Sequence, residues 1–480
     1  MTTATKQETT VTKSTSAAIP ATAGEDLQQL ASDIVARALR AGAADAEVVI
    51  REGDEFSTLV RLGQVETLKE SGSRGMGLRV LIATANGNRV ASTSSSDFSP
   101  EGIDHLVSGA LSLARVTSED PFAGLADPSE FGKIGGENGG DLELYHEDVH
   151  SLPTAERIEY ARRAEAAALS ADARITNSDG ANFDAYTGRK VFANSRGFAG
   201  EYRASSCSIS ARPIALGKNG EMQRDYWYTY ARSLKKLDTP ECVGSEAARR
   251  AVRRLDARRV KTQQAPIVFA PEVARSLIGS IFEASSGEAI YRGASFLTGR
   301  LGQMIAAPSV TVVDDHTIAG GFGTSPFDGE GLPSRRTVVV EQGTLSNYML
   351  NTYTARKLGM KSTGNASRGL AGNPGIGACN LFLVGGSSSP QEIVAGVQSG
   401  LYVTELLGQG VNLVTGDYSR GASGLWIEKG ELVYPVQQVT IAGNLRQMLQ
   451  DIAAIGDDLI FRGSVASPTL RVDGMMIAGE

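Results

Sequence analysis

The pattern that most constrains the fold is an amphipathic helix followed by a series of short alternating strands, which occurs twice in the first half of the chain. In the first copy, apolar residues recur at helical spacing within 27–39, and runs of alternating apolar and polar residues follow within 46–94. A second helix begins near Thr154, and another series of polar, alternating strands follows it. The repetition predicts two related subdomains, at about 25–120 and 140–240.

The second half of the chain is richer in strands with tight turns. A strand leads into a helix that begins at Pro271, and later strands turn at Gln342-Gly343 and at Lys429-Gly430. Glycine makes up 55 of the 480 residues without a three-residue period, which favours strands and turns over a collagen-like chain.

These patterns together predict an α+β fold with two domains. We expect an N-terminal helix-and-strand domain over 25–255 and a strand-rich C-terminal domain over 256–480. Residues 1–24 are polar and low in apolar side chains, so we expect them to form a disordered tail.

The charge and composition of the chain argue against binding to nucleic acid, insertion into a membrane and secretion. The net charge of −7 makes the surface a poor partner for a phosphate backbone. No apolar run approaches the ~20 residues that span a bilayer, and the N-terminus lacks the apolar core of a secretory signal. Cys207, Cys242 and Cys379 are too few and too far apart for a disulfide scaffold or a zinc ribbon. We therefore expect a cytoplasmic protein that binds neither nucleic acid nor membranes.

One segment formally spells the zinc-protease motif HExxH, with His146, Glu147 and His150. In such a motif the two histidines lie one helical turn apart and bind the metal, while the glutamate activates water. Here the segment lies between a Gly-Gly pair and Pro153, which leaves barely two turns, and its flanks lack an apolar face. Glu165 is the one conceivable third ligand. We interpret the segment as a solvated loop before a helix, with a zinc site as the alternative.

A basic helix is the second conspicuous feature. We expect its charged face to be solvated or paired with acidic neighbours, because the sequence lacks the basic surround and aromatic platforms of a nucleic-acid site. The glycine-rich segments carry no phosphate-loop motif, and Ser419 and Ser423 lack a GxSxG elbow. The arginines of the helix are Arg249, Arg250, Arg253, Arg254, Arg258 and Arg259.

Residues 415–452, TGDYSRGASGLWIEKGELVYPVQQVTIAGNLRQMLQDI, resemble the C-terminal signature of the TldD/PmbA family, and more narrowly its TldE (PmbA) branch. Further agreement comes from 325–336 (SPFDGEGLPSRR), 345–366 (LSNYMLNTYTARKLGMKSTGNA), 402–412 (YVTELLGQGVN) and the terminal MMIAGE. The likeness extends over nearly all of 25–480 and is strongest after residue 320.

The resemblance implies a two-domain fold in which a TldD-like and a TldE-like subunit pair as a metalloprotease. In TldD-like chains an HExxxH motif opens a helix of the second domain and binds zinc with help from a downstream cysteine. The matching positions here are Ala270, Pro271 and Arg275. Alanine and proline offer no ligand or base, and arginine stays protonated without a lone pair for a metal. Cys379 lies in a different segment, and no cysteine follows it. The resemblance therefore implies that this chain has no zinc site and no catalytic residue. It implies that the zinc ion is bound by a TldD-like partner.

The segment Asp417-Tyr418-Ser419-Arg420 is the candidate for the substrate cavity or the subunit contact. It lies in a sequence flanked by glycine, which predicts a turn. The alternative is a buried turn in which Asp417 caps the backbone and Arg420 is paired.

Three hypotheses about function follow. The first is a zinc-free, TldE-like subunit of a cytoplasmic metalloprotease, which helps to bind and position unfolded or flexible peptides for a TldD-like partner. The second is a self-sufficient zinc hydrolase that uses His146, Glu147 and His150. The third is a peptide-binding scaffold with no hydrolytic role.

Overall fold

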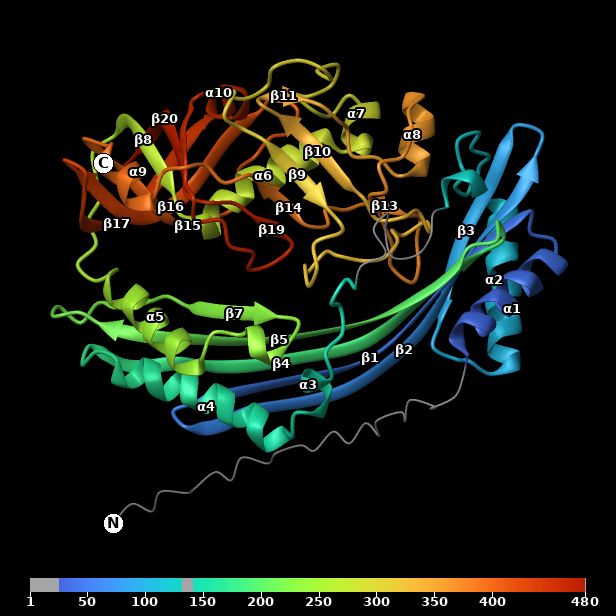
Figure 1. The fold of residues 1–480 in the computed structure, drawn as a ribbon, viewed down its shortest axis with the longest axis horizontal. Helices are drawn as coiled ribbons and strands as arrows, with labels where there is room; N and C mark the ends of the chain where they lie inside the picture. The colour runs from blue at the N-terminus through green and yellow to red at the C-terminus, as the bar shows by residue number, and fades with distance from the viewer. Residues whose placement is uncertain (1–25, 132–140, 480) are drawn as a thin grey trace, which may run out of the picture.

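A computed structural model describes residues 26–131 and 141–479 of the chain. The fold is α+β with two domains, as the sequence predicts (Figure 1). The N-terminal domain is built on one large curved sheet, and the strand-rich C-terminal domain lies in the concave side of that sheet. The predicted tail, residues 1–24, lies outside the described residues.

The strands of both predicted subdomains join in a single seven-stranded sheet. Its order is β3-β2-β1-β4-β5-β6, and β7 also pairs with β5. The two series meet where β1 pairs antiparallel with β4, from Glu47 opposite Asn194 to Val60 opposite Ala181. The strands are β1 (Asp45–Arg61), β2 (Gln64–Thr84), β3 (Gly87–Ser95), β4 (Ile175–Asn194), β5 (Ala199–Leu216), β6 (Met222–Arg224) and β7 (Trp227–Ala231).

Helices cover one face of this sheet. Because side chains alternate between the faces of a strand, Val48, Ile50, Phe56 and Val60 of β1 all point to the helical face. Val48 and Ile50 pack in one core with α1 and α2, whereas Phe56 and Val60 pack in another with α4 and α5. The helices are α1 (Leu27–Arg40), α2 (Pro100–Val116), α3 (Glu147–Ser151), α4 (Thr154–Ser170) and α5 (Pro240–Val252), with 3-10 turns at Pro128–Glu130 and Leu234–Lys236.

The opposite face of the sheet carries the contact with the C-terminal domain. Val49 and Phe192 point to this side, where they and Phe198 pack around Phe327 of the C-terminal domain. Beside these rings, the buried carboxylate of Glu47 accepts hydrogen bonds from Arg79 of β2, at 2.6 Å, and from Arg368 of the C-terminal domain. A buried charge cluster therefore joins the two domains.

The C-terminal domain contains a closed barrel. Its strands follow the order β17-β16-β15-β8-β20, and β17 also pairs with β20, so the ring closes; β18 extends it from β20. The strands are β8 (Gln263–Phe269), β15 (Ser399–Leu407), β16 (Asp417–Glu428), β17 (Glu431–Asn444), β18 (Ile452–Ile455) and β20 (Leu470–Ala478).

A second, smaller sheet packs beside the barrel, in the order β11-β10-β9-β14-β19. Its strands are β9 (Val312–Asp315), β10 (Arg336–Glu341), β11 (Thr344–Leu345), β14 (Leu381–Leu383) and β19 (Val465–Ala466), and β12 (Ala366–Ser367) pairs separately with β13 (Gly375–Ile376). The helices of the domain are α6 (Pro271–Ser285), α7 (Gly287–Tyr291), α8 (Thr352–Leu358), α9 (Pro390–Ala395) and α10 (Leu445–Gln450).

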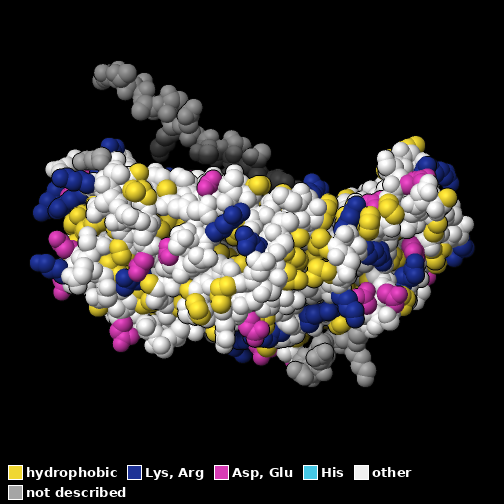
Figure 2. Space-filling view, turned by 90° about the horizontal axis from the view of Figure 1, so that it is seen from above, with side chains coloured by type: hydrophobic (Ala, Val, Ile, Leu, Met, Phe, Trp, Pro, Cys, Tyr) yellow, Lys and Arg dark blue, Asp and Glu magenta, His cyan; other side chains and the backbone are white. Residues whose placement is uncertain are grey.

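The surface seen from above is long and mixed in character. Basic and acidic side chains are both scattered over this face, and apolar patches lie between them (Figure 2). Within residues 26–131 and 141–479, no helix combines the length and the apolar character needed to cross a membrane.

The charge cluster at the domain junction gives the first testable prediction. We expect Glu47→Ala to lower the free energy of unfolding by about 3–5 kcal/mol, because it leaves two buried arginines without their carboxylate. Glu159→Ala is the matched control: Glu159 pairs with Arg162 on the surface, so its loss should cost less than about 1 kcal/mol. Urea denaturation of both variants measures the difference, and equal losses would contradict the prediction.

The same carboxylate predicts the direction of the pH dependence. Burial raises the pKa of Glu47, but Arg368 and Arg79 together outweigh burial, so this pKa lies below its ordinary value. The stabilisation is therefore complete above the pKa of the unfolded chain and is lost as the pH falls through the lower pKa of the folded chain. Glu47→Ala should accordingly flatten the acid limb of the stability curve.

Candidate functional site

The degenerate motif positions Ala270, Pro271 and Arg275 lie together at the start of α6. Ala270 follows the barrel strand β8 and is the N-cap of α6, and Pro271 occupies the first helical position. One side of α6, including Leu277 and Ile281, is buried in the core of the C-terminal domain. The helix is thus fixed by packing, and Arg275, Ser276 and Gly279 on its other side are half-buried.

A cavity of about 270 Å³ lies beside the start of α6, between the two domains. We call it the arginine cavity, because five arginines line it against three acidic residues. Its lining includes Trp227 of β7, the end of α5 and the start of α6. The five arginines are Arg249, Arg250, Arg253, Arg275 and Arg462, and the acidic residues are Glu246, Glu272 and Asp458.

A second hollow of about 590 Å³ follows the open side of α6, and we call it the α6 groove. One wall consists of Arg275, Ser276, Gly279, Ser280 and Glu283, which lie on one face of the helix. Residues 409–411, Arg420 and residues 463–465 form the rest of the lining. Arg275 and Val465 line both hollows, so the two are adjoining.

The arginines of the cavity differ in how they are paired. Arg249 makes a bidentate pair with Glu246, with both N···O distances at 2.7 Å. Arg462 lies over the Trp227 ring and donates to the Tyr228 carbonyl at 3.1 Å. The prediction of a solvated or paired basic face therefore holds for Arg249, for Arg254, which pairs with Glu405 at 2.7 Å, and for the exposed Arg258 and Arg259.

Arg250 and Arg253 are the exceptions. The Arg250 side chain is 8% exposed, and its nearest carboxylates, Asp225 and Glu272, are 3.6 and 3.9 Å away. Burial, together with the charge of Arg250, lowers the pKa of Arg253 to about 10. Within the described chain, the Arg250 Nε and one terminal nitrogen of Arg253 are buried without a hydrogen-bond partner. These inward-facing arginines were missed by the sequence reasoning.

The segment 417–420 begins the strand β16, so the predicted turn is wrong. Its residues pair with β17, Asp417 opposite Asn444 and Arg420 opposite Ile441, because the barrel continues through the glycine-flanked segment. Tyr418 is 2% exposed in the core, whereas Asp417 and Ser419 are exposed on the other face.

Of these four residues, Arg420 is the one that lines the α6 groove. Asp417 is instead held at the surface by Thr415 Oγ1 at 2.6 Å and by the Asn444 amide at 3.1 Å. The structure therefore brings Arg420 together with Arg275 in one groove and leaves the rest of the segment outside it.

The HExxH segment does not have the geometry of a metal site. The short helix α3 begins at Glu147, so His146 is extended, with φ −131° and ψ 126°, and the two histidines do not share a helical face. His150 is exposed, and the Glu147 carboxylate accepts a hydrogen bond from the Tyr145 hydroxyl at 2.8 Å. The segment predicted to be a solvated loop is therefore partly helical, because Glu147–Ser151 form the short helix α3.

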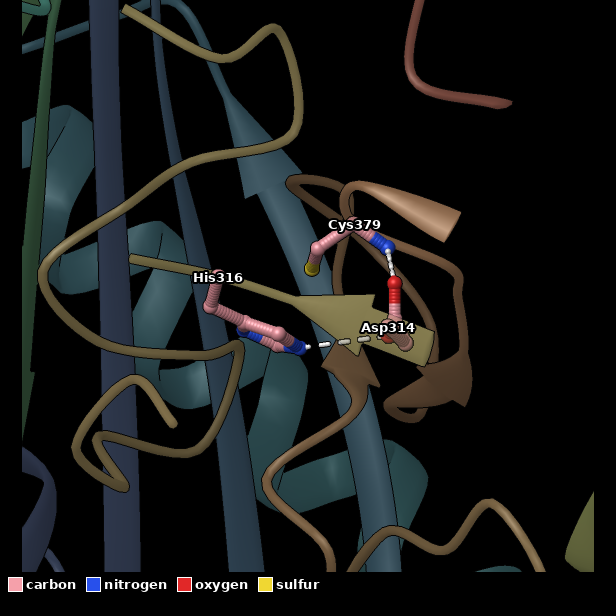
Figure 3. Close-up of side chains that lie close together, drawn as sticks. All are labelled: Asp314, His316 and Cys379. Carbon is pink, nitrogen blue, oxygen red and sulfur yellow. Dashed lines mark hydrogen bonds and ion pairs between the residues drawn. The ribbon is translucent and has the colours of Figure 1, made fainter. Parts of the chain in front are cut away.

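Among the described residues, one group of three possible metal ligands comes together elsewhere, at Asp314, His316 and Cys379 (Figure 3). Their ligand atoms lie within 4.8 Å of one another, and the group is largely buried. Asp314 and His316 stand at the end of β9, on one side of the strand, and Cys379 precedes β14. Sequence reasoning missed this group, because Cys379 follows Asp314 only after a long intervening segment.

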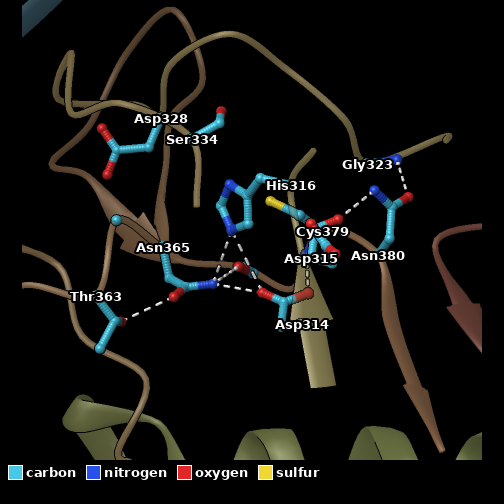
Figure 4. A network of polar contacts seen from close by, with 12 residues as sticks. Asp314, Asp315, His316, Gly323, Asp328, Ser334, Thr363, Asn365, Cys379 and Asn380 are labelled. Carbon is cyan, nitrogen blue, oxygen red and sulfur yellow. Dashed lines mark hydrogen bonds and ion pairs between the residues drawn. The ribbon is translucent and has the colours of Figure 1, made fainter. Parts of the chain in front are cut away.

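The hydrogen bonds of this cluster do not fit a metal (Figure 4). One Asp314 oxygen accepts from the Cys379 N–H at 2.9 Å, and the other accepts from the Asn365 amide at 2.6 Å. The same Asn365 nitrogen lies 3.3 Å from His316 Nε2 and donates to the Gly377 carbonyl. A cation at this point would meet the N–H groups of Asn365 and Cys379, which already donate to the two Asp314 oxygens. The cluster is therefore a polar junction between loops.

Profiles of the PmbA/TldA metallopeptidase domains match most of the chain. Domain 1 matches residues 46–114, the central domain matches 147–255, and the C-terminal domain matches 262–479. Metalloprotease PmbA of Escherichia coli O157:H7 is 40% identical over 443 residues, which cover 92% of this chain and 94% of that protein.

Solved structures share the fold. A protein of Bacteroides thetaiotaomicron named as a modulator of DNA gyrase superposes with a TM-score of 0.86 at 27% identity, over 95% of this chain and all of that one. TldE from Thermococcus kodakarensis superposes with a TM-score of 0.80 at 20% identity, over 93% of this chain and 99% of that one.

The buried thiol of Cys207 and the half-buried thiol of Cys379 give a testable prediction. Burial, followed by the charges of Asp314 and Asp328, raises the pKa of Cys379 well above its ordinary value, and burial raises the pKa of Cys207 to about 12. We expect a thiol reagent such as DTNB to modify one thiol per folded chain, the exposed Cys242, even at mildly alkaline pH.

Unfolding the protein should release all three thiols to the reagent. Cys242→Ser is the control and should leave the folded chain unreactive. Rapid modification of Cys379 in that variant would contradict the polar-junction interpretation.

Proposed function

Because this chain belongs to the PmbA/TldD metallopeptidase family, we propose that it is a zinc-free, TldE-like subunit of a cytoplasmic heteromeric metalloprotease acting on unfolded or flexible peptides. The family match confirms the resemblance found in the sequence. The observation that carries the proposal is the start of α6. Ala270 and Pro271 present no metal ligand there, and Arg275 presents a cation.

The residues around Arg275 do not fit a zinc ion. Five arginines, Arg275 among them, line the arginine cavity. Their positive charge opposes the binding of a zinc ion there. We infer that hydrolysis belongs to a TldD-like partner, whose zinc would supply an activated water when bound. The contribution of this chain is to hold the peptide and fix its orientation.

The α6 groove is the part of the surface suited to that task. The strand β19 is the edge of its sheet, and its residue Val465 lines both hollows. An extended peptide can add to such an edge through its backbone, which gives affinity without demanding a particular sequence. A bound peptide held in this way loses the freedom that would otherwise slow attack by the partner's water.

Zinc content tests the assignment. We expect elemental analysis to find almost no zinc in the purified chain, and about one zinc per complex after co-expression with a TldD-like partner. His146→Ala should change neither value. Stoichiometric zinc in the isolated chain, lost in His146→Ala, would instead favour the self-sufficient hydrolase. Peptide binding without cleavage in the presence of the partner would favour the scaffold.

A substitution that fills the groove tests the peptide path. Gly279 lies on the open face of α6, and no heavy atom lies within 4 Å of a Cβ added there. Gly279→Phe should therefore fold normally and weaken peptide binding by at least about tenfold, which corresponds to about 1.4 kcal/mol.

Gly109 of α2 provides a matched control, because a Cβ added there also meets no atom within 4 Å. Gly109→Phe should leave peptide binding and the activity of the complex unchanged. Calorimetric titration of both variants with a flexible peptide measures the effect, and an unimpaired Gly279→Phe would rule out the α6 groove.

A further inference from the structure

We propose that the arginine cavity binds the carboxylate of a peptide whose chain runs along the α6 groove. The inference rests on the proposed function and adds to it a chemical feature of the substrate. Its basis is the uncompensated positive charge of Arg253 and Arg275, together with buried donors without acceptors, in a cavity that adjoins a groove suited to an extended chain.

Two of the five arginines keep an uncompensated positive charge once the carboxylates near the cavity are assigned to their partners. Glu246 is held by Arg249, and Asp458 accepts hydrogen bonds from the Thr469 N–H and hydroxyl, both at 2.8 Å. Glu272 is 3.9 Å from Arg250, too far for a hydrogen bond. Asp225 lies 3.6 Å from Arg250, and Asp238 lies 3.3 Å from Arg462. In the described part of the chain, the arginines of the cavity without a carboxylate within 4 Å are therefore Arg253 and Arg275.

Two of these arginines also carry buried donors that lack an acceptor. In the described part of the chain, Arg250 Nε and a terminal nitrogen of Arg253 are buried without a hydrogen bond. A buried donor without a partner is unfavourable, and a guanidinium that gains a carboxylate forms strong charge-assisted hydrogen bonds. Among residues 26–131 and 141–479, the Arg275 side chain has one long hydrogen bond, to the Tyr228 hydroxyl at 3.4 Å, and so retains donors for a ligand.

The rest of the lining favours a peptide carboxylate over a phosphate. Trp227, Tyr402 and Ile460 provide apolar surface for the side chain or backbone next to the carboxylate. The cavity adjoins the α6 groove at Arg275 and Val465, so one chain can occupy both.

The carboxylate has two possible sources, the C-terminus of the peptide or an acidic side chain. Calorimetric titration of the full-length chain with three flexible peptides separates them: one with a free C-terminus, its C-terminal amide, and the amide with one internal glutamate. We expect the free acid to bind at least about tenfold more tightly than the amide. Recovery of this affinity by the internal glutamate would identify the side-chain carboxylate as an equivalent ligand.

Arginine variants locate the effect. Arg253→Gln should remove the advantage of the free acid while leaving the affinity for the amide unchanged, and Arg275→Gln offers a second test should Arg253→Gln fail to fold. Arg162→Gln is the matched control, since Arg162 pairs with Glu159 on the surface of α4 and its loss changes the net charge equally. This control should keep the full preference for the free acid.

The outcomes separate this inference from the proposed function. Equal binding of all three peptides, still abolished by Gly279→Phe, would overturn the carboxylate site and leave the peptide-binding role intact. An unchanged preference for the free acid in Arg253→Gln and Arg275→Gln would also overturn the site. Failure of every peptide to bind, both to this chain and to its complex with a TldD-like partner, would overturn both proposals.

Discussion

The buried carboxylate of Glu47, shared between Arg79 and Arg368, is the interaction on which the rest of the structure depends. It lies where the concave face of the N-terminal sheet meets the C-terminal domain, next to the packed rings of Phe192 and Phe327. A buried charge tolerates little displacement of its partners, because each lost contact leaves an ion without solvent. The arginine cavity lies at the same junction of the domains, so its shape depends on how they dock.

The features that the sequence predicts well are those decided within a few residues. The helix predicted to begin at Pro271 does begin there, because the fixed φ of a proline acts locally. The predictions of two hairpin turns are confirmed as well. Gln342 and Lys429 have positive φ, and a glycine with positive φ follows each of them. The α+β class and the two-domain arrangement follow from such elements in order.

The candidate site was harder to predict, because its residues come together through contacts between domains. Arg250 and Arg253 belong to a helix whose charged face looks solvated in sequence, yet α6 and β19 from the other domain enclose it. The expected turn at 417–420 is a strand, because barrel closure extends pairing beyond the glycines. Asp314 and Cys379 are joined by strand pairing between β9 and β14, which no local pattern reveals.

The shortness of β19 has a kinetic consequence. An edge of two residues offers an added chain few backbone hydrogen bonds, each worth about 1 kcal/mol net. A peptide held mainly by such an edge would have a brief residence time, and its departure would not be slowed by any particular sequence. Rapid exchange of this kind suits a surface that must sample many flexible segments, release most of them, and retain one only when a second contact engages.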